Sequence, residues 1–144
     1  MRLVISRVSH ASVQVKGKIV GEIGKGLFVL VGVKKGDTEE MAHELAEKLA
    51  KLRVMADKEA KMNLSVKDVA GEILVVSQFT LYAETKGGNR PSFIQAAEPG
   101  VAKRIYEKFV TELREKGIKV ATGSFGDYME ISAELDGPVT ILLE

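Results

Sequence analysis

Three hydrogen-bonding side chains follow an apolar run near the middle of the chain. Residues 73–76 read Ile-Leu-Val-Val, and Ser77, Gln78 and Thr80 then stand around Phe79. The apolar run is typical of a strand that is buried on both faces. A polar group at the end of such a strand is either satisfied by its neighbours or faces a ligand. The stretch by itself leaves both interpretations open, the satisfied strand end being the more common.

Two other places carry residues that could do chemistry. Arg90 lies beside a glycine-rich stretch, in Asn-Arg-Pro-Ser-Phe at 89–93, where it could hold a phosphate or simply be solvated. Gly137 and Pro138 separate two apolar stretches, a pattern that usually marks only a turn. These patterns alone do not choose among the three places.

Several kinds of site are excluded by what the sequence lacks. It has no cysteine, so disulfides, thiolate metal sites and cysteine nucleophiles are ruled out. Its two histidines, His10 and His43, are too few for a histidine-rich metal site. No phosphate-binding loop or dinucleotide-binding glycine motif is present. We therefore expect no metal and no cofactor. We expect His43 to be a plain surface residue, and His10 lacks the oriented third group that Ser-His catalysis needs.

Length and composition indicate one globular domain. The chain has 144 residues, of which 45% are hydrophobic and 28% charged. No apolar run approaches the roughly 20 residues needed to span a bilayer, and the first residues do not resemble a secretory signal. We therefore expect a cytoplasmic protein with no membrane partner. A net charge of +1 argues against a protein that wraps DNA, but it is compatible with contact to a short end of RNA.

Hydrophobic periodicity predicts two helices that would position these residues. The first would begin at Asp37, in a capping box with Glu40. It would bury an apolar line at Met41, Leu45, Leu49 and Leu52. Its opposite, solvated face would carry Glu39, His43 and Glu47. The second helix would begin at Pro99 and end at Gly117, with an apolar line at Val101, Ile105, Phe109 and Leu113.

Strands are expected on both sides of these helices. The expected strands cover 3–15, 19–23, 27–33, 73–76, 118–121, 128–135 and 139–143. Antiparallel hairpins are expected at both ends, with a sharp break at Asp136-Gly137-Pro138. This order predicts a single domain over 1–144 of the mixed α/β (α+β) class. Mixed or antiparallel β-sheets would form a layered or barrel-like core, with the two main helices packed on one side.

Three short motifs together resemble the D-aminoacyl-tRNA deacylase (D-tyrosyl-tRNA(Tyr) deacylase) family. They are Ser-Gln-Phe-Thr-Leu at 77–81, Asn-Arg-Pro-Ser-Phe at 89–93 and Gly-Pro-Val-Thr at 137–140. Supporting similarity lies at 7–13 and 61–65, so the resemblance runs essentially end to end with the motifs in the family's order. One departure is Ala60, where the family pattern has glycine; it concerns loop geometry and no candidate site residue.

The resemblance implies a homodimer that hydrolyses the ester between a D-amino acid and the 3′-terminal adenosine of tRNA, and that also removes glycine from mischarged tRNA. It implies that Ser77, Gln78, Phe79 and Thr80 line the catalytic pocket, where backbone N–H groups form an oxyanion hole. Aminoacyl-tRNA would then be the partner, with neither DNA nor a membrane involved.

The resemblance also assigns the remaining candidate residues. Gly137 and Pro138 would form a Gly-cisPro pair that enters the partner subunit's pocket, binds the substrate's α-ammonium through carbonyl oxygens and excludes an L side chain. The terminal adenosine would lie against an apolar set made up of Ala96, Ala97, Phe125 and Met129. Arg90 could contact a phosphate.

The mechanism is less constrained than the reaction. Thr80 could act as a nucleophile, but its hydroxyl would need a base, and neither histidine has an evident route to it. We therefore expect Thr80 to orient other groups while the 2′-hydroxyl of the tRNA assists the attack. The alternatives are a non-catalytic binder of tRNA 3′ ends, a threonine-nucleophile esterase for another carboxyl ester, and a structural homodimer with a vestigial pocket.

Overall fold

The long first strand, β1 (Arg2–Val15), organises the sheet because it pairs with three other strands. In the computed structural model, which describes residues 1–144, its first half pairs with β3 (Gly26–Gly32) and its second half with β2 (Lys18–Ile23). The last strand, β8 (Glu130–Leu143), pairs with β1 along almost the whole length of β1. All three pairings are antiparallel.

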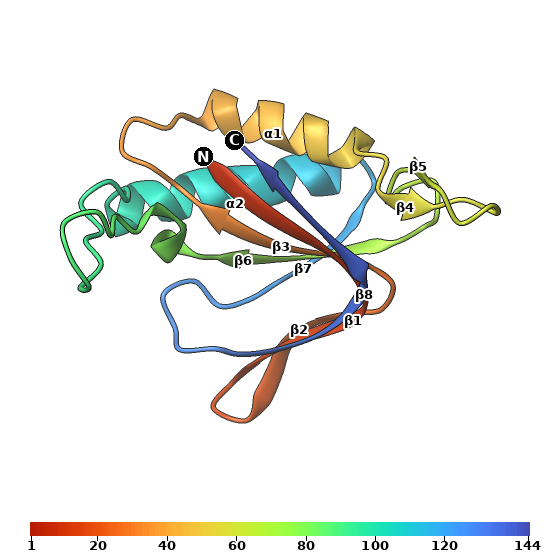
Figure 1. The fold of residues 1–144 in the computed structure, drawn as a ribbon, viewed down its shortest axis with the longest axis horizontal. Helices are drawn as coiled ribbons and strands as arrows, with labels where there is room; N and C mark the ends of the chain where they lie inside the picture. Colours follow the sequence, from red (N-terminus) through yellow and green to blue (C-terminus); the bar gives the residue numbers. More distant parts are fainter.

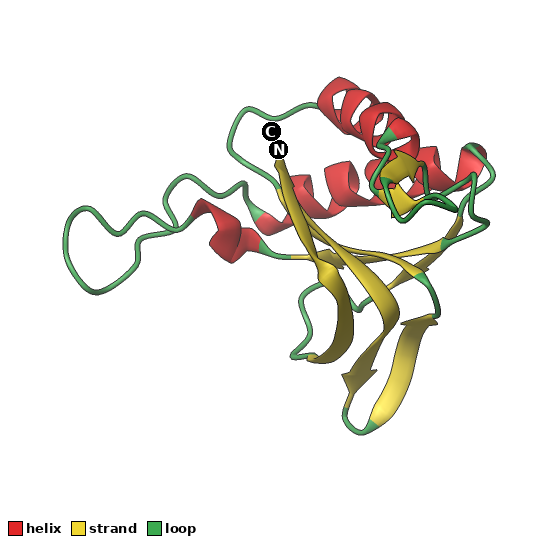
Figure 2. Ribbon diagram, turned by 45° about the vertical axis from the view of Figure 1, so that its right-hand side comes forward, coloured by secondary structure: helices red, strands yellow, loops and turns green.

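Two parallel strands extend the sheet beyond β3. β6 (Glu72–Ser77) runs parallel to β3, and β7 (Lys119–Thr122) runs parallel to β6, giving the order β2-β1-β3-β6-β7. The sheet curls until its ends approach each other (Figure 2). At Gly21 an added Cβ would lie 2.3 Å from the carbonyl oxygen of Thr122, so only glycine allows β2 and β7 to come this close. The sheet is nearly a closed barrel.

Both helices cover one face of this sheet (Figure 1). They are α1 (Glu39–Lys51) and α2 (Pro99–Glu115), and neither is long and apolar enough to cross a membrane. The main core lies between them and the sheet, where Leu49, Phe109 and Leu113 are fully buried. A smaller core fills the curl of the sheet and is made up of Val8, Ala11, Val13, Ile23, Leu74 and Val76. The predicted mixed fold, with two helices on one side, is confirmed.

The predicted start of the first helix was wrong in its detail. Thr38 caps α1, since its side chain accepts a hydrogen bond from the Met41 amide at 3.4 Å. Asp37 instead accepts from the Lys34 amide at 2.6 Å and pairs with the ammonium group of Met1 at 2.7 Å. Met41 is 42% exposed, so the apolar line of α1 begins one residue later, at Ala42.

The predicted solvated face of α1 is only partly right, because α2 packs beside it. Its three polar side chains stay 36–49% exposed, but each forms an ion pair with α2 or with the residue that caps it: Glu39 with Arg104, His43 with Glu112 and Glu47 with Lys116. The His43 Nδ1 lies 2.8 Å from the Glu112 carboxylate, which is almost fully buried. His43 is therefore part of the helix–helix contact rather than a plain surface residue.

The predicted break and hairpin at the C-terminal end do not exist. β8 continues through Gly137 and Pro138 and pairs with β1, whereas β7 pairs only with β6. Shifts in the β1–β8 register near Val8 accommodate this segment. β8 lies at an edge of the sheet, where proline is tolerated because one side of the strand needs no hydrogen-bonding partner. The Gly137–Pro138 peptide bond is cis.

A two-stranded ribbon completes the fold. It consists of β4 (Met55–Ala56) and β5 (Met62–Leu64), which pair antiparallel beyond the C-terminal end of α1. The positive φ of 63° at Ala60 lies in the turn between them. Glycine, which the family resemblance led us to expect at this position, adopts such a conformation readily.

Candidate active site

The polar stretch begins where β6 ends and a single 3-10 turn, η1 (Phe79–Tyr82), follows. The Gln78 amide donates to the Val31 carbonyl at 2.8 Å, which extends the β3–β6 pairing by one bond. The Leu81 amide is already bonded to the Gln78 carbonyl. The first residues of a helical turn have no acceptor within it, which here applies to Phe79 and Thr80. These two N–H groups, and not that of Gln78, are the ones left for a ligand.

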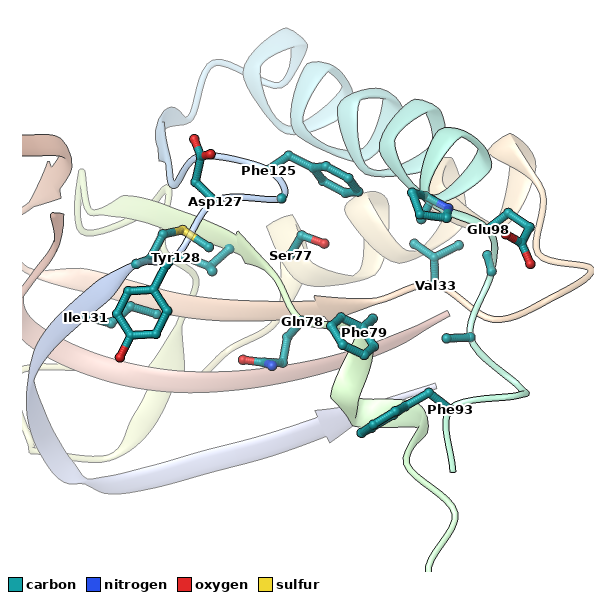
Figure 3. Close-up of a pocket in the computed structure, with 17 residues that line it drawn as sticks. Val33, Ser77, Gln78, Phe79, Phe93, Glu98, Phe125, Asp127, Tyr128 and Ile131 are labelled. Atoms are coloured by element: carbon teal, nitrogen blue, oxygen red, sulfur yellow. The ribbon is translucent and has the colours of Figure 1, made fainter. Parts of the chain in front are cut away.

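A pocket of about 560 Å³ opens beside this turn (Figure 3). Most of its lining is apolar, with a few polar groups, as in typical small-molecule sites. The predicted site residues that line it are Ser77, Gln78, Phe79, Ala96, Ala97, Phe125 and Met129. The fold therefore brings together, from three separate segments, residues that the sequence places up to 52 positions apart.

One wall of the pocket comes from the segment between β7 and β8, and local contacts hold it in place. The Phe125 ring packs against Tyr106 of α2, with ring centroids 5.9 Å apart. The Met129 sulfur accepts a hydrogen bond from the Ser124 amide at 3.3 Å. A Cβ at Gly123 would lie 2.7 Å from that sulfur, so a larger residue there would displace Met129.

Tyr106 fixes α2 to the strand that carries the polar stretch. Its hydroxyl donates to the Val75 carbonyl at 2.9 Å in the interior. Burial raises the pKa of Tyr106 to about 12, so the hydroxyl remains protonated and keeps donating at neutral pH. This hydrogen bond joins two walls of the pocket, α2 and the end of β6, at a point two residues before Ser77.

Aromatic rings lie at the mouth of the pocket. Phe79 and Phe93 meet edge to face, with centroids 5.0 Å apart and planes 74° apart, and Phe79 is 54% exposed. Tyr128 is 88% exposed and also lines the opening. Exposed ring faces of this kind are suited to stacking against a base or another planar group.

Several lining residues were missed by the sequence analysis. They are Val33, Val76, Phe93, Glu98, Pro99, Ala102, Gly126, Asp127, Tyr128 and Ile131. Glu98 and Asp127 matter most, because they add two carboxylates to a largely apolar pocket. Glu98 directly precedes the proline that starts α2, next to Ala96 and Ala97, and that position could have indicated it. We find no comparable signal for Asp127.

Four predicted site residues do not line the pocket of their own chain. Thr80 is exposed, and its hydroxyl accepts a hydrogen bond from the Gln78 side chain. Arg90 is exposed on the loop that follows Glu84. Gly137 and Pro138 are exposed on β8. Their catalytic, phosphate-binding and cross-subunit roles stay predictions.

Neither histidine lies in the pocket. His10 pairs with Glu22 on the β1–β2 side of the sheet at 3.1 Å, and His43 pairs with Glu112 between the helices. No group of three or more His, Asp or Glu side chains is placed to hold a metal ion. The chemistry that the pocket offers therefore consists of backbone N–H donors, the hydroxyl and amide groups of 77–80, and the carboxylates of Glu98 and Asp127.

Comparisons with a family model and with individual proteins point to the same family. The model of the family described as D-Tyr-tRNA(Tyr) deacylase matches residues 4–144. The chain is 56% identical over its whole length to a D-aminoacyl-tRNA deacylase of Thermotoga petrophila, covering 97% of that protein. It is 54% identical to the protein of the same name from Lactobacillus acidophilus, covering 99% of it.

Two solved structures share the fold. One, described as a c-Myc DNA unwinding element binding protein, is 40% identical and superposes with a TM-score of 0.93, covering 100% of this chain and 98% of that one. The other, described as a probable eukaryotic D-amino acid tRNA deacylase, has a TM-score of 0.84 at 19% identity, covering 99% and 97%. At that identity the second similarity concerns the fold alone.

Proposed function

Since the chain belongs to the D-Tyr-tRNA(Tyr) deacylase family, we propose that it hydrolyses the ester between a D-amino acid and the 3′-terminal adenosine of tRNA, releasing both. The observation that carries this proposal is the pocket at the end of β6, which is lined by Ser77, Gln78 and Phe79 and lies beside the first turn of η1, where the Phe79 and Thr80 N–H groups have no acceptor within the turn. The products are tRNA and a free amino acid, so water is the only co-reactant that the reaction needs.

The free N–H groups supply the electrostatic part of the catalysis. When water attacks the ester carbonyl carbon, negative charge develops on the carbonyl oxygen. Donors preorganised around that oxygen contribute roughly 3–4 kcal/mol each in comparable sites. The first turn of η1 offers two such donors in one place, from Phe79 and Thr80. Collapse of the intermediate breaks the ester C–O bond, and the 3′-oxygen of the adenosine leaves with a proton.

The absence of a base on Thr80 supports a substrate-assisted step. A threonine nucleophile would need a base within hydrogen-bonding reach, but both histidines are engaged elsewhere, the Asp127 carboxylate accepts from the Ser124 hydroxyl, and the Thr80 hydroxyl is bonded to neither Glu98 nor Asp127. The Thr80 hydroxyl instead accepts a hydrogen bond from Gln78. In this mechanism Thr80 and Gln78 orient each other and the ester, while the 2′-hydroxyl of the terminal ribose assists the attacking water.

The terminal adenosine would be bound by the apolar wall of the pocket. The Phe125 ring, held against Tyr106, and the Met129 side chain, held by Ser124, form a preorganised surface for a flat base. Ala96 and Ala97 also line the pocket and are small enough to leave room for it. Stacking on aromatic rings is the usual way in which proteins hold unpaired RNA bases.

Chiral selection would come from a second copy of the chain. Gly137 and Pro138 are exposed on the free edge of the sheet, and so are the large apolar residues Leu135 and Leu142 of the same strand. Burial of this strand in a homodimer would bring Gly137 and Pro138 to the partner's pocket. Their carbonyl oxygens would bind the α-ammonium group and leave no room for an L side chain, whereas glycine would not be excluded.

The deciding experiment follows amino-acid release from matched D-tyrosyl-, L-tyrosyl- and glycyl-tRNA. Rapid loss of the D-ester and of glycine, with the L-ester intact, is the expected result for a cytoplasmic enzyme of this specificity. Equal loss of the D- and L-esters would keep the hydrolase and reject the role of Gly137 and Pro138. Stoichiometric protection without release would favour the non-catalytic binder of tRNA 3′ ends.

A further inference from the structure

A second cavity, of about 610 Å³, adjoins the active-site pocket, and Phe125 lines both. It lies between one flank of α2 and the segment 122–125 that follows β7. The close-up in Figure 3 shows how the Phe125 ring points toward α2, which places it between the two cavities. We call this second cavity the α2 groove.

The chemistry of the α2 groove differs from that of the pocket. Along α2 it is lined by Lys103, Glu107, Thr111 and Arg114, and on the opposite side by Thr122 and Ser124. Two cations therefore face one carboxylate. The Lys103 ammonium lies 3.9 Å from that carboxylate, at the limit of an ion pair. Arg114 gives one of its five N–H donors to the Val120 carbonyl at 3.1 Å, which fixes the side chain and leaves the other donors for a ligand.

This flank of α2 is not used to pack against α1. The residues that pair with α1 are Arg104, Glu112 and Lys116, which lie on the neighbouring flank. Lys103 and Arg114 bound the groove and are 11 positions apart, so they are separated by about 16 Å along the helix axis. A single small anion cannot meet both, whereas a chain with repeated negative charges can.

We propose that the α2 groove binds the ribose–phosphate backbone of the unpaired nucleotides that precede the terminal adenosine of the tRNA substrate. This inference rests on the proposed function. A nucleoside that lies against Phe125 in the pocket has a 5′-phosphate that must leave the pocket, and the α2 groove begins at the same ring. Proteins that hold single-stranded nucleic acid combine aromatic stacking with a neighbouring positive groove, and these two cavities have that combination.

The test compares two substrates that differ only in the nucleotides beyond the adenosine. One is D-tyrosyl-tRNA, and the other is the D-tyrosyl ester of adenosine, which has no phosphate. The main variant is Lys103→Gln/Arg114→Gln, and the matched control is Lys48→Gln, which removes an exposed, unpaired lysine from α1. A second variant, Thr111→Glu, adds a negative charge to the groove without removing the hydrogen bond between Arg114 and Val120.

On D-tyrosyl-tRNA we expect kcat/KM to fall about tenfold in the double variant, because two cations that neutralise phosphates are gone. The dependence of log kcat/KM on log salt concentration should become shallower by about 0.7 for each phosphate that the variant no longer neutralises. Thr111→Glu should lower kcat/KM on tRNA as well. The adenosine ester should be hydrolysed at the wild-type rate by all variants, and Lys48→Gln should match wild type on both substrates.

Three outcomes would overturn the inference. Unchanged kcat/KM on tRNA in both groove variants would show that the phosphates pass elsewhere, for example along the loop that carries Arg90. An equal fall on both substrates would show a structural effect on the pocket. A salt dependence that stays at the wild-type slope would show that neither Lys103 nor Arg114 neutralises a phosphate. Failure of the proposed function itself is distinct, because the wild-type protein would then hydrolyse neither substrate.

Discussion

Arg7 in the first strand and Asp136 in the last are joined by two contacts. The Arg7 Nε donates to the main-chain carbonyl oxygen of Asp136 at 3.1 Å and lies 3.2 Å from its carboxylate. The same guanidinium donates to the Val54 carbonyl at 2.9 Å, and the Arg7 side chain is only 12% exposed. The residue directly before Gly137 is thereby anchored to the body of the domain from 129 positions away.

Replacement of Arg7 by lysine should weaken chiral selection more than hydrolysis. Lysine keeps the charge but has a single nitrogen, so it cannot reach Asp136 and Val54 together. We expect the ratio of kcat/KM for D-tyrosyl-tRNA to that for L-tyrosyl-tRNA to fall several-fold. Arg53→Lys is the matched control, since Arg53 bonds only to Asn63 in the β4–β5 ribbon. An unchanged ratio in Arg7→Lys would contradict the anchoring role.

Gly137→Ala should disturb the same segment by a different route. Gly137 has a φ of 140°, and an added Cβ would lie 2.7 Å from the Val139 nitrogen and 2.9 Å from its Cγ2. The backbone must therefore move at this position, and we expect the D-to-L ratio to fall further than in Arg7→Lys. Gly36→Ala has a similarly positive φ with open space around it and controls for backbone conformation alone. Retention of wild-type selectivity in Gly137→Ala would exclude a direct role for this segment.

Thr80→Ala distinguishes an orienting group from a nucleophile. In the substrate-assisted mechanism the variant should retain measurable hydrolysis, because Thr80 only positions Gln78 and the ester. A substrate with 2′-deoxyadenosine at its 3′ end should in contrast be cleaved about 10²–10⁴ times more slowly, the usual contribution of a positioned proton-transfer group. Single-turnover rates with both substrates measure this. If Thr80→Ala binds substrate and folds normally but has no activity, Thr80 is the nucleophile.

Tyr106→Phe should destabilise the domain without changing its shape. The variant removes one of two donors to the buried Val75 carbonyl, since the Gly123 amide still donates to that oxygen at 3.1 Å, so we expect a loss of about 0.5–1.5 kcal/mol. Denaturant unfolding measures the change in the free energy of unfolding. Tyr128→Phe, at a highly exposed position, should change it by less than about 0.5 kcal/mol. Equal effects of the two substitutions would refute the role of the buried hydrogen bond.

Glu47 should make stability sensitive to acid. Its hydrogen bonds to Lys116 and then to Lys51 lower its pKa from 4.5 to about 2 in the folded protein. Between pH 4.5 and about 2 the unfolded chain therefore binds the proton more readily, so stability falls as the pH falls through that window. Thermal unfolding from about pH 6 to about pH 2 should show a shallower fall of Tm in Glu47→Gln. Glu44→Gln, on the same helix and without an ion pair, should follow the wild-type curve.

Features that depend on local pattern could be predicted from the residues alone. The run at 73–76 is a fully buried strand, and the periodicity of both helices predicted their extents to within a few residues. These predictions succeed because burial on both faces, or on one helical face, leaves its mark within a short window of residues. The family resemblance likewise rested on short motifs, and it located seven of the residues that line the pocket.

Features that depend on contacts between distant residues became clear only from the folded chain. The polar face of α1 could not be assigned to α2 from its own residues, because the same charges suit either water or a neighbouring helix. Gly137 and Pro138 look like a break in sequence, yet the register with β1 carries β8 through them. Contacts between distant segments likewise place Thr80 outside the pocket lining and Glu98 within it. The direction of a side chain at the end of an element follows from the packing of segments far apart in the chain, and that packing leaves no local periodicity.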